Sequence, residues 1–158
     1  MIRLIACGRM KEKWMQEGAG EYLKRIQAYD KIEMVEVADE KAPENNSEAD
    51  NIKVKKKEGE HLLSRIKDDE YVILLDLAGH TIDSVQLSDK IQNLYTSGRS
   101  RIDFVIGGSL GVSEELIARA DDRWCISKNT FPHQLCRIIV LEQIYRAFRI
   151  LHHEPYHK

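Results

Sequence analysis

The chain has 158 residues, of which 42% are hydrophobic and 32% are charged, and its net charge is −2. This composition is typical of a globular domain and excludes wholesale disorder, and no apolar run approaches the ~20 residues that span a membrane. The three cysteines are unclustered, which fits a reducing compartment and provides neither a disulfide framework nor a zinc site. Because the N-terminal apolar run is too short for a signal peptide, we expect one cytoplasmic domain over residues 1–158.

Short apolar runs alternate with helical patterns along the whole chain. Strands are predicted at residues 2–6, 32–37, 71–77, 102–106 and 123–126, and helices at 11–28, 47–66, 84–95, from 113 and after 130. Ser47 and Asp50 have the spacing of a capping box, and Ser84, Ser113 and Thr130 are predicted N-caps, with Pro132 in the first turn of the last helix. This alternation predicts an α/β fold with a mostly parallel sheet and helices on both faces.

The last predicted helix carries two apolar stripes, whereas an ordinary surface helix carries one. We expect one stripe to face the domain core and the other, which includes Leu135, Ile138 and Tyr145, to face a partner subunit in a homodimer. The alternative is a central helix in a single core. In that case its charged residues must be paired, because isolated buried charges are costly. The charged residues interleaved with the second stripe are Glu142, Arg146 and Arg149.

Three strand ends are followed by loops of the type that binds ligands, at residues 75–79, 107–111 and 126–131. In a parallel sheet, ligands bind beyond the carboxyl ends of the strands. We interpret the glycines of the second loop as positions where the backbone approaches a flat or extended ligand closely, and two tight turns are the alternative. Arg137 lies one turn into the last helix, where it either points at a ligand or bonds to loop carbonyls.

The same glycine loop matches the G-x-S-x-G pattern of serine hydrolases. Ser109 would be the nucleophile, Asp121 or Asp122 the acid and His133 the base. The next helix, however, begins at its own cap, Ser113, and no second glycine-rich loop supplies an oxyanion hole. We therefore treat a hydrolase as a minor alternative.

Charge is unevenly distributed along the chain. From Lys128 onward, five basic residues oppose two acidic ones, so this segment is +3 and the remainder is −5. A polyanion would meet the C-terminal end, unless this is an ordinary fluctuation. The lysine run at 53–57 is either a solvated face or an RNA-facing one. The tail HHEPYHK lacks a convincing metal-ligand spacing, and its Tyr156 and His157 suit contact with a nucleobase unless the terminus is frayed.

Several separated motifs resemble one family over nearly the whole chain. They are, in order, ACGRMKEKW, DEKAPE, FVIGGSLG, SKNTFPHQLCR, EQIYRA and EPYHK. Together they are similar to the RlmH family, the SPOUT-class methyltransferases that act on N3 of a pseudouridine in bacterial 23S rRNA. One departure lies before EPYHK, where the family usually has an Arg and then a Gly. This chain has His152 and His153 there, so its helix stop lacks the glycine.

The resemblance implies a SPOUT fold with a C-terminal trefoil knot, a homodimer and 23S rRNA in the ribosome as the partner. It implies methyl transfer from S-adenosyl-L-methionine, with Tyr156 positioning the base, His157 accepting a proton and Arg137 countering charge. A non-catalytic RNA-binding module is the alternative function. The residues implied to hold the cofactor are Leu75, Gly107, Gly108, Ile126, Ser127, Lys128, Asn129, Thr130 and Phe131.

Overall fold

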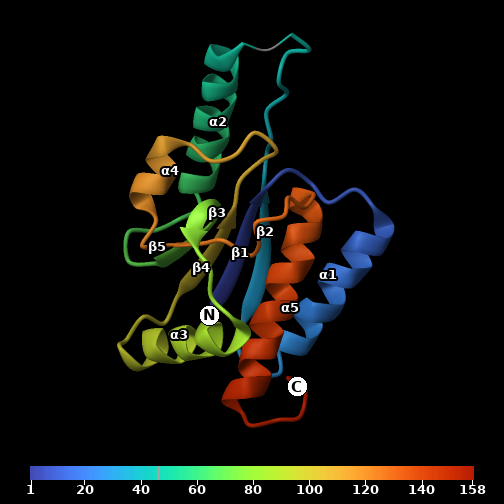
Figure 1. Cartoon of the computed structure of the whole chain (residues 1–158), viewed down its shortest axis with the longest axis vertical. Helices are drawn as coiled ribbons and strands as arrows, with labels where there is room; N and C mark the ends of the chain where they lie inside the picture. Colours follow the sequence, from blue (N-terminus) through green and yellow to red (C-terminus); the bar gives the residue numbers. More distant parts are fainter. Residues whose placement is uncertain (46) are drawn as a thin grey trace.

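A five-stranded parallel sheet lies between two layers of helices in the computed structural model, which describes residues 1–45 and 47–158 (Figure 1). The strands are β1 (Ile2–Cys7), β2 (Ile32–Val37), β3 (Tyr71–His80), β4 (Ile102–Ile106) and β5 (Asp122–Trp124). The helices are α1 (Lys13–Ile26), α2 (Glu48–Leu63), α3 (Ser84–Thr96), α4 (Glu114–Arg119) and α5 (His133–Leu151). The predicted α/β fold and its order of elements are confirmed.

The strand order is β2-β1-β4-β3-β5, and every neighbouring pair is parallel. Phe104 in β4 is in register with Leu4 in β1 and with Ile73 in β3. Because all strands run the same way, the loops that follow β4, β3 and β5 emerge at one edge of the sheet, from three adjacent strands.

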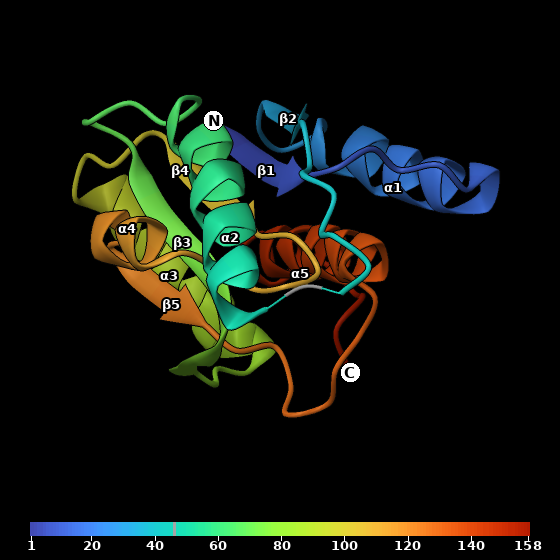
Figure 2. The same ribbon diagram turned by 90° about the horizontal axis from the view of Figure 1, so that it is seen from above.

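Side-chain alternation along the strands divides the core into two layers. Phe104 and its neighbours pack against α1, α3 and α5, and the edge of the Trp124 ring meets Phe104 with the ring centroids 6.1 Å apart. Val105 faces the other way, toward Leu62 of α2 and Leu116 of α4. The sheet is therefore covered on both faces, and Figure 2 shows the loop between β5 and α5 (orange) extending away from the sheet before the chain enters α5.

Local capping signals were predicted with mixed success. Ser47 forms the capping box with Asp50, and Ser113 caps α4, as predicted. The N-cap of α3, however, is Asp83 and not Ser84, because the Asp83 carboxylate accepts from the backbone N–H of Gln86 and the Gln86 side chain accepts from the N–H of Asp83.

The prediction that Thr130 caps the last helix is also wrong. The N-cap position of α5 is Pro132, which has no side-chain capping hydrogen bond, and the helix begins at His133. Thr130 therefore stays in the preceding loop. Strand β3 also extends beyond its predicted end to His80, because His80 pairs with Trp124 of β5 after an irregularity in the register.

Part of the second stripe of α5 faces α1 of the same chain, and assigning it to a partner subunit is wrong for the buried Tyr145; Ile138 is only partly buried, so its place in a dimer interface stays a prediction. A side chain at Gly18 of α1 would contact Ile138, with the Cβ only 3.4 Å from Ile138 Cδ1. Tyr145 is buried, with ring centroids 6.2 Å from Tyr22 and 6.3 Å from Tyr29. The alternative of a central helix in one core is therefore correct for Tyr145.

The charged residues of this stripe are paired, as a central helix requires. Arg146 donates to Glu142 with the nitrogen and oxygen 2.6 Å apart, and Arg149 pairs with Glu154 of the tail. Glu154 also accepts a hydrogen bond from the hydroxyl of Tyr29 at 3.0 Å. These pairs fasten the start of the tail to α5 and to the turn after α1.

Helix α5 ends in the αL conformation despite the missing glycine. The N–H of Glu154 donates to the carbonyl of Arg149 at 2.9 Å, and the N–H of His153 donates to Ile150 at 3.1 Å. These are the two hydrogen bonds of a Schellman motif. His153 occupies its left-handed position with φ 54°, which a residue with a side chain adopts at a cost of roughly 1–2 kcal/mol.

Candidate active site

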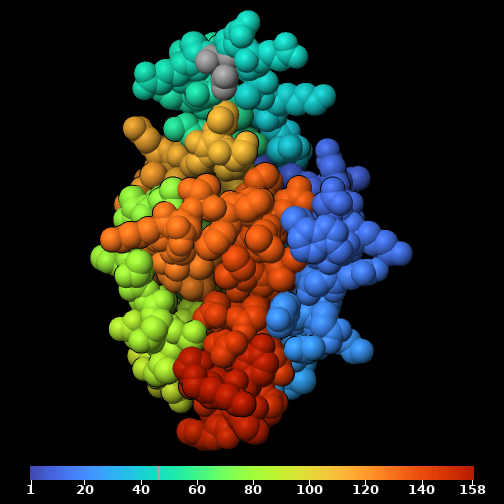
Figure 3. Space-filling model, turned by 45° about the vertical axis from the view of Figure 1, so that its right-hand side comes forward, coloured from blue at the N-terminus to red at the C-terminus, as the bar shows by residue number. Residues whose placement is uncertain are grey.

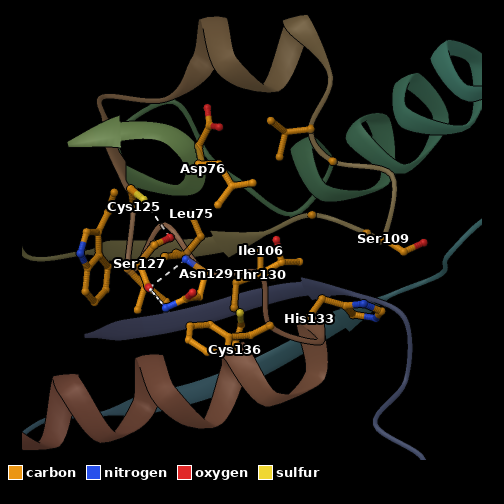
Figure 4. Close-up of a pocket in the computed structure, with 18 residues that line it drawn as sticks. Leu75, Asp76, Ile106, Ser109, Cys125, Ser127, Asn129, Thr130, His133 and Cys136 are labelled. Atoms are coloured by element: carbon orange, nitrogen blue, oxygen red, sulfur yellow. Dashed lines mark hydrogen bonds between the residues drawn. The ribbon is translucent and has the colours of Figure 1, made fainter. Parts of the chain in front are cut away.

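A cavity of about 260 Å³ lies at the carboxyl ends of β3, β4 and β5 (Figure 4). The three loops predicted to bind a ligand converge on it, together with the first turn of α5. Every predicted cofactor residue except Lys128, which is exposed, lines this cavity. Those that line it are Leu75, Gly107, Gly108, Ile126, Ser127, Asn129, Thr130 and Phe131.

The glycine loop after β4 is a tight turn closed by a hydrogen bond from the N–H of Gly111 to the carbonyl of Gly108 at 3.1 Å. A Cβ added to Gly107 would lie 2.9 Å from Val112 Cγ1, and one added to Gly108 would lie 2.5 Å from Glu58 Oε1. Both contacts are with the protein itself. Packing within the protein thus already favours glycine at both positions, in line with the alternative of tight turns, and the close approach of a ligand to this backbone stays a prediction.

The loop between β5 and α5 is shaped by the hydroxyl of Ser127. Ser127 Oγ accepts hydrogen bonds from the backbone N–H of Asn129 at 3.0 Å and from its side-chain amide at 3.3 Å. The thiol of Cys125 donates to the Ser127 carbonyl at 3.2 Å. These local bonds hold the loop in a defined shape around the cavity.

Two titratable residues of the cavity wall, Asp76 and His133, were not among the predicted cofactor residues. The Asp76 carboxylate pairs with Arg123 at 2.6 Å and accepts from the N–H of Ala78 at 3.1 Å. Burial and the nearby charge of Arg137 lower the pKa of His133, so its imidazole is neutral at neutral pH. The sequence held one indication that each belongs to the site. Asp76 interrupts an apolar strand, and His133 directly follows a loop at the edge of the sheet.

Arg137 does not line the cavity. Its side chain is fully buried and donates to the carbonyls of Cys7 at 2.7 Å and Gly8 at 3.0 Å, and to Glu36 at 2.8 Å. Burial lowers its pKa, and the Glu36 carboxylate partly offsets this effect. Of the two interpretations from the sequence, the geometry favours an arginine that ties α5 to the carboxyl end of β1.

Among the described residues, Tyr156 and His157 are not part of the cavity wall; the tail folds back along α5, and both residues contact side chains in the middle of that helix. The Tyr156 hydroxyl donates to Glu142 at 3.1 Å, and Arg146 lies over the Tyr156 ring, 4.6 Å from its centroid. His157 Nδ1 is 3.2 Å from Arg146. Figure 3 shows the tail (red) at one end of the molecule and α2 (teal) at the other. A single chain therefore does not bring the tail to its own cavity.

The alternative hydrolase triad is not formed. Ser109 and His133 both line the cavity, but the described residues contain no hydrogen bond between them. Asp121 accepts from the N–H of Val72 at 2.8 Å, and Asp122 pairs with Lys90. Across residues 1–45 and 47–158, we find no cluster of three or more His, Cys, Asp or Glu arranged to hold a metal ion. No helix in the same residues is both long and apolar enough to cross a membrane.

A family model described as a predicted SPOUT methyltransferase matches residues 1–157. The chain is 52% identical over 157 residues to ribosomal RNA large subunit methyltransferase H 1 of Clostridium perfringens, covering 99% of both proteins. It is 53% identical to ribosomal RNA large subunit methyltransferase H of Alkaliphilus oremlandii, again over 99% of both. A probable methylase family protein from Haemophilus influenzae aligns with 99% of this chain and 70% of its own, at a TM-score of 0.54. Its identity of 12% limits that likeness to the fold.

Proposed function

The chain belongs to the SPOUT methyltransferase family and is an rRNA methyltransferase, and we propose that it transfers a methyl group from S-adenosyl-L-methionine to N3 of a pseudouridine in 23S rRNA. The observation that carries this proposal is the convergence of three strand-end loops on one cavity, in a chain 52% identical over its whole length to an rRNA large subunit methyltransferase H. We place the protein in the cytoplasm and its substrate in the ribosome.

The cavity walls fit the chemistry of the proposed cofactor. S-adenosyl-L-methionine supplies, when bound, an activated methyl group on a positively charged sulfur. Among the described residues, no Lys or Arg lines the cavity, and Asp76 contributes a carboxylate that is paired with Arg123. Apolar side chains such as Leu75, Ile106 and Ile126 suit a flat base, while the peptide groups of the loops offer donors and acceptors. We infer that loop shape determines affinity more than most individual side chains do.

The acceptor nitrogen must lose a proton before or during transfer, because N3 of pseudouridine is an imide. Burial and the Glu142 carboxylate raise the pKa of Tyr156 to about 12, so its phenol stays protonated at neutral pH. Tyr156 can thus donate a hydrogen bond to the base, but it is not a ready proton acceptor. We propose His157 for that role and an in-line arrangement of N3 with the methyl group as the main contribution of the site.

A second subunit would resolve the separation between tail and cavity. Tyr156 contacts Glu142, which lies six residues after Cys136 of the cavity wall, or about 9 Å along the axis of α5 at 1.5 Å per residue. We propose a homodimer in which each cavity is completed by Tyr156 and His157 of the other chain. We also propose that the C-terminal segment forms the trefoil knot of the family over a single domain, residues 1–158. We infer that Arg137 holds α5 against the carboxyl end of β1 and does not contact substrate.

The proposal is tested first by calorimetry with S-adenosyl-L-methionine. We expect one binding event per chain, unchanged by a metal chelator. Ile126→Trp should abolish binding, because the indole would occupy the cavity, while Lys128→Ala should not, because Lys128 lies outside it. Absence of binding by the wild-type protein, or binding that requires a metal, would contradict the cofactor assignment.

A further inference from the structure

Glu58 of α2 is a glutamate in an unusual environment. Its side chain is only 4% exposed. Oε2 accepts hydrogen bonds from the Cys7 thiol at 3.2 Å and from the backbone N–H of Glu40 at 3.1 Å. Oε1 is buried as well, yet it has no hydrogen-bond partner among the residues that the structure describes. A buried acceptor without a partner is costly, and such groups in native proteins call for an explanation.

The unpaired oxygen lies directly behind the glycine turn of the cavity. A Cβ on Gly108 would be 2.5 Å from Oε1 and 2.8 Å from Oε2, so the backbone at Gly108 touches the carboxylate. Gly108 also lines the cavity. Only the backbone of the turn therefore separates Glu58 from the space proposed for the cofactor.

The same turn of α2 also contacts the other end of this segment. A Cβ on Gly59 would lie 2.3 Å from Ser113 Oγ, the hydroxyl that caps α4. Residues 58 and 59 thus contact both ends of segment 108–113. The turn at residues 108–111 is closed by a hydrogen bond from the N–H of Gly111 to the carbonyl of Gly108. The N–H groups of its two central residues, Ser109 and Leu110, take no part in that bond.

We propose that Glu58 is a positioning residue of the cofactor site, whose free oxygen accepts a hydrogen bond from the peptide N–H of Ser109 or Leu110 when S-adenosyl-L-methionine binds. This inference rests on the proposed function. The carboxylate is already fixed by Cys7 and Glu40, so forming the bond requires reorientation of the glycine turn alone. Cofactor binding would then satisfy an acceptor that is unsatisfied without it.

The test compares Glu58→Gln with Glu60→Gln, an exposed glutamate of the same helix. Glutamine keeps the size of Glu58 and retains one oxygen for Cys7 and Glu40, but it places an amide where the free acceptor stood. Calorimetry should show affinity for S-adenosyl-L-methionine reduced about tenfold or more in Glu58→Gln, and changed less than about twofold in Glu60→Gln. Without ligand, Glu58→Gln should unfold at the same temperature as wild type or higher, because an unpaired buried acceptor has been removed.

Amide hydrogen exchange of the wild-type protein provides a readout that does not depend on the folding of a variant. In the wild-type protein, saturating cofactor should protect the amide of Ser109 or of Leu110, and this protection should be absent in Glu58→Gln. The inference would be overturned if Glu58→Gln bound the cofactor with unchanged affinity, or if its affinity and its stability fell to the same extent. It would also be overturned if the cofactor protected neither amide in the wild-type protein. If wild type fails to bind S-adenosyl-L-methionine at all, the proposed function falls as well, whereas the other outcomes leave it standing.

Discussion

Arg137 and Glu36 form an ion pair with their nitrogen and oxygen 2.8 Å apart, and the arginine is completely buried between α5 and the sheet. The same guanidinium satisfies the carbonyls of Cys7 and Gly8. Replacing Arg137 leaves these carbonyls and the Glu36 carboxylate without their buried donor. Breaking a buried ion pair in this way typically lowers the free energy of unfolding by about 3–5 kcal/mol. We expect Arg137→Gln to lose about 3 kcal/mol of unfolding free energy in urea. A loss below about 1 kcal/mol with methyl transfer abolished would instead assign Arg137 to the chemistry.

The left-handed residue at the end of α5 offers a stabilising substitution. His153→Gly should raise the unfolding free energy by about 0.5–1 kcal/mol, because glycine adopts φ 54° without a steric penalty. His152→Gly is the matched control, since His152 has φ −93° and gains nothing from glycine. It should lower the unfolding free energy. Equal effects of the two substitutions in thermal unfolding would contradict the Schellman geometry.

The neutral state of His133 makes stability depend on pH. Burial and Arg137 lower the pKa of His133 in the folded protein below its ordinary value of about 6.5. The unfolded chain therefore binds a proton more readily, and stability is lost as pH falls below about 6.5. Between pH 7.5 and 5.5 the wild-type unfolding free energy should fall more steeply than that of His133→Gln. Parallel pH profiles for the two proteins would show that His133 does not titrate as described.

The separation of tail and cavity predicts complementation between two defective chains. A chain with Tyr156→Ala and His157→Ala should bind cofactor without transferring methyl groups, and a chain with Ile126→Trp should do neither. We keep Glu154 in the first chain, because it pairs with Arg149. A mixture of the two should regain part of the activity through one competent site per mixed dimer. If the mixture stays inactive although light scattering shows normal dimers, the two-chain site is wrong.

The order of the strands and helices was the most predictable part of this fold, whereas the predicted caps were right at Ser47 and Ser113 and wrong at Ser84 and Thr130. Ser47 and Asp50 lie three residues apart, so their capping box is visible in the sequence, and the strand-end loops follow from the strand pattern. Contacts between distant residues were not predictable. Nothing in the sequence shows that Ile138 packs on Gly18, or that Glu58 lies behind Gly108, because the fold brings these pairs together from positions far apart in the chain. The trefoil knot and the catalytic roles of the tail remain predictions.

The central claim is that this chain methylates N3 of a pseudouridine in 23S rRNA. The most direct measurement is transfer of tritium from methyl-labelled S-adenosyl-L-methionine to ribosomes from a strain lacking the protein, compared with naked rRNA. We expect label in the 23S rRNA of ribosomes, released on digestion as N3-methylpseudouridine, and much less in naked rRNA. Binding of ribosomes without any label would support a non-catalytic RNA-binding module, and label in any nucleoside other than N3-methylpseudouridine would contradict the proposed reaction.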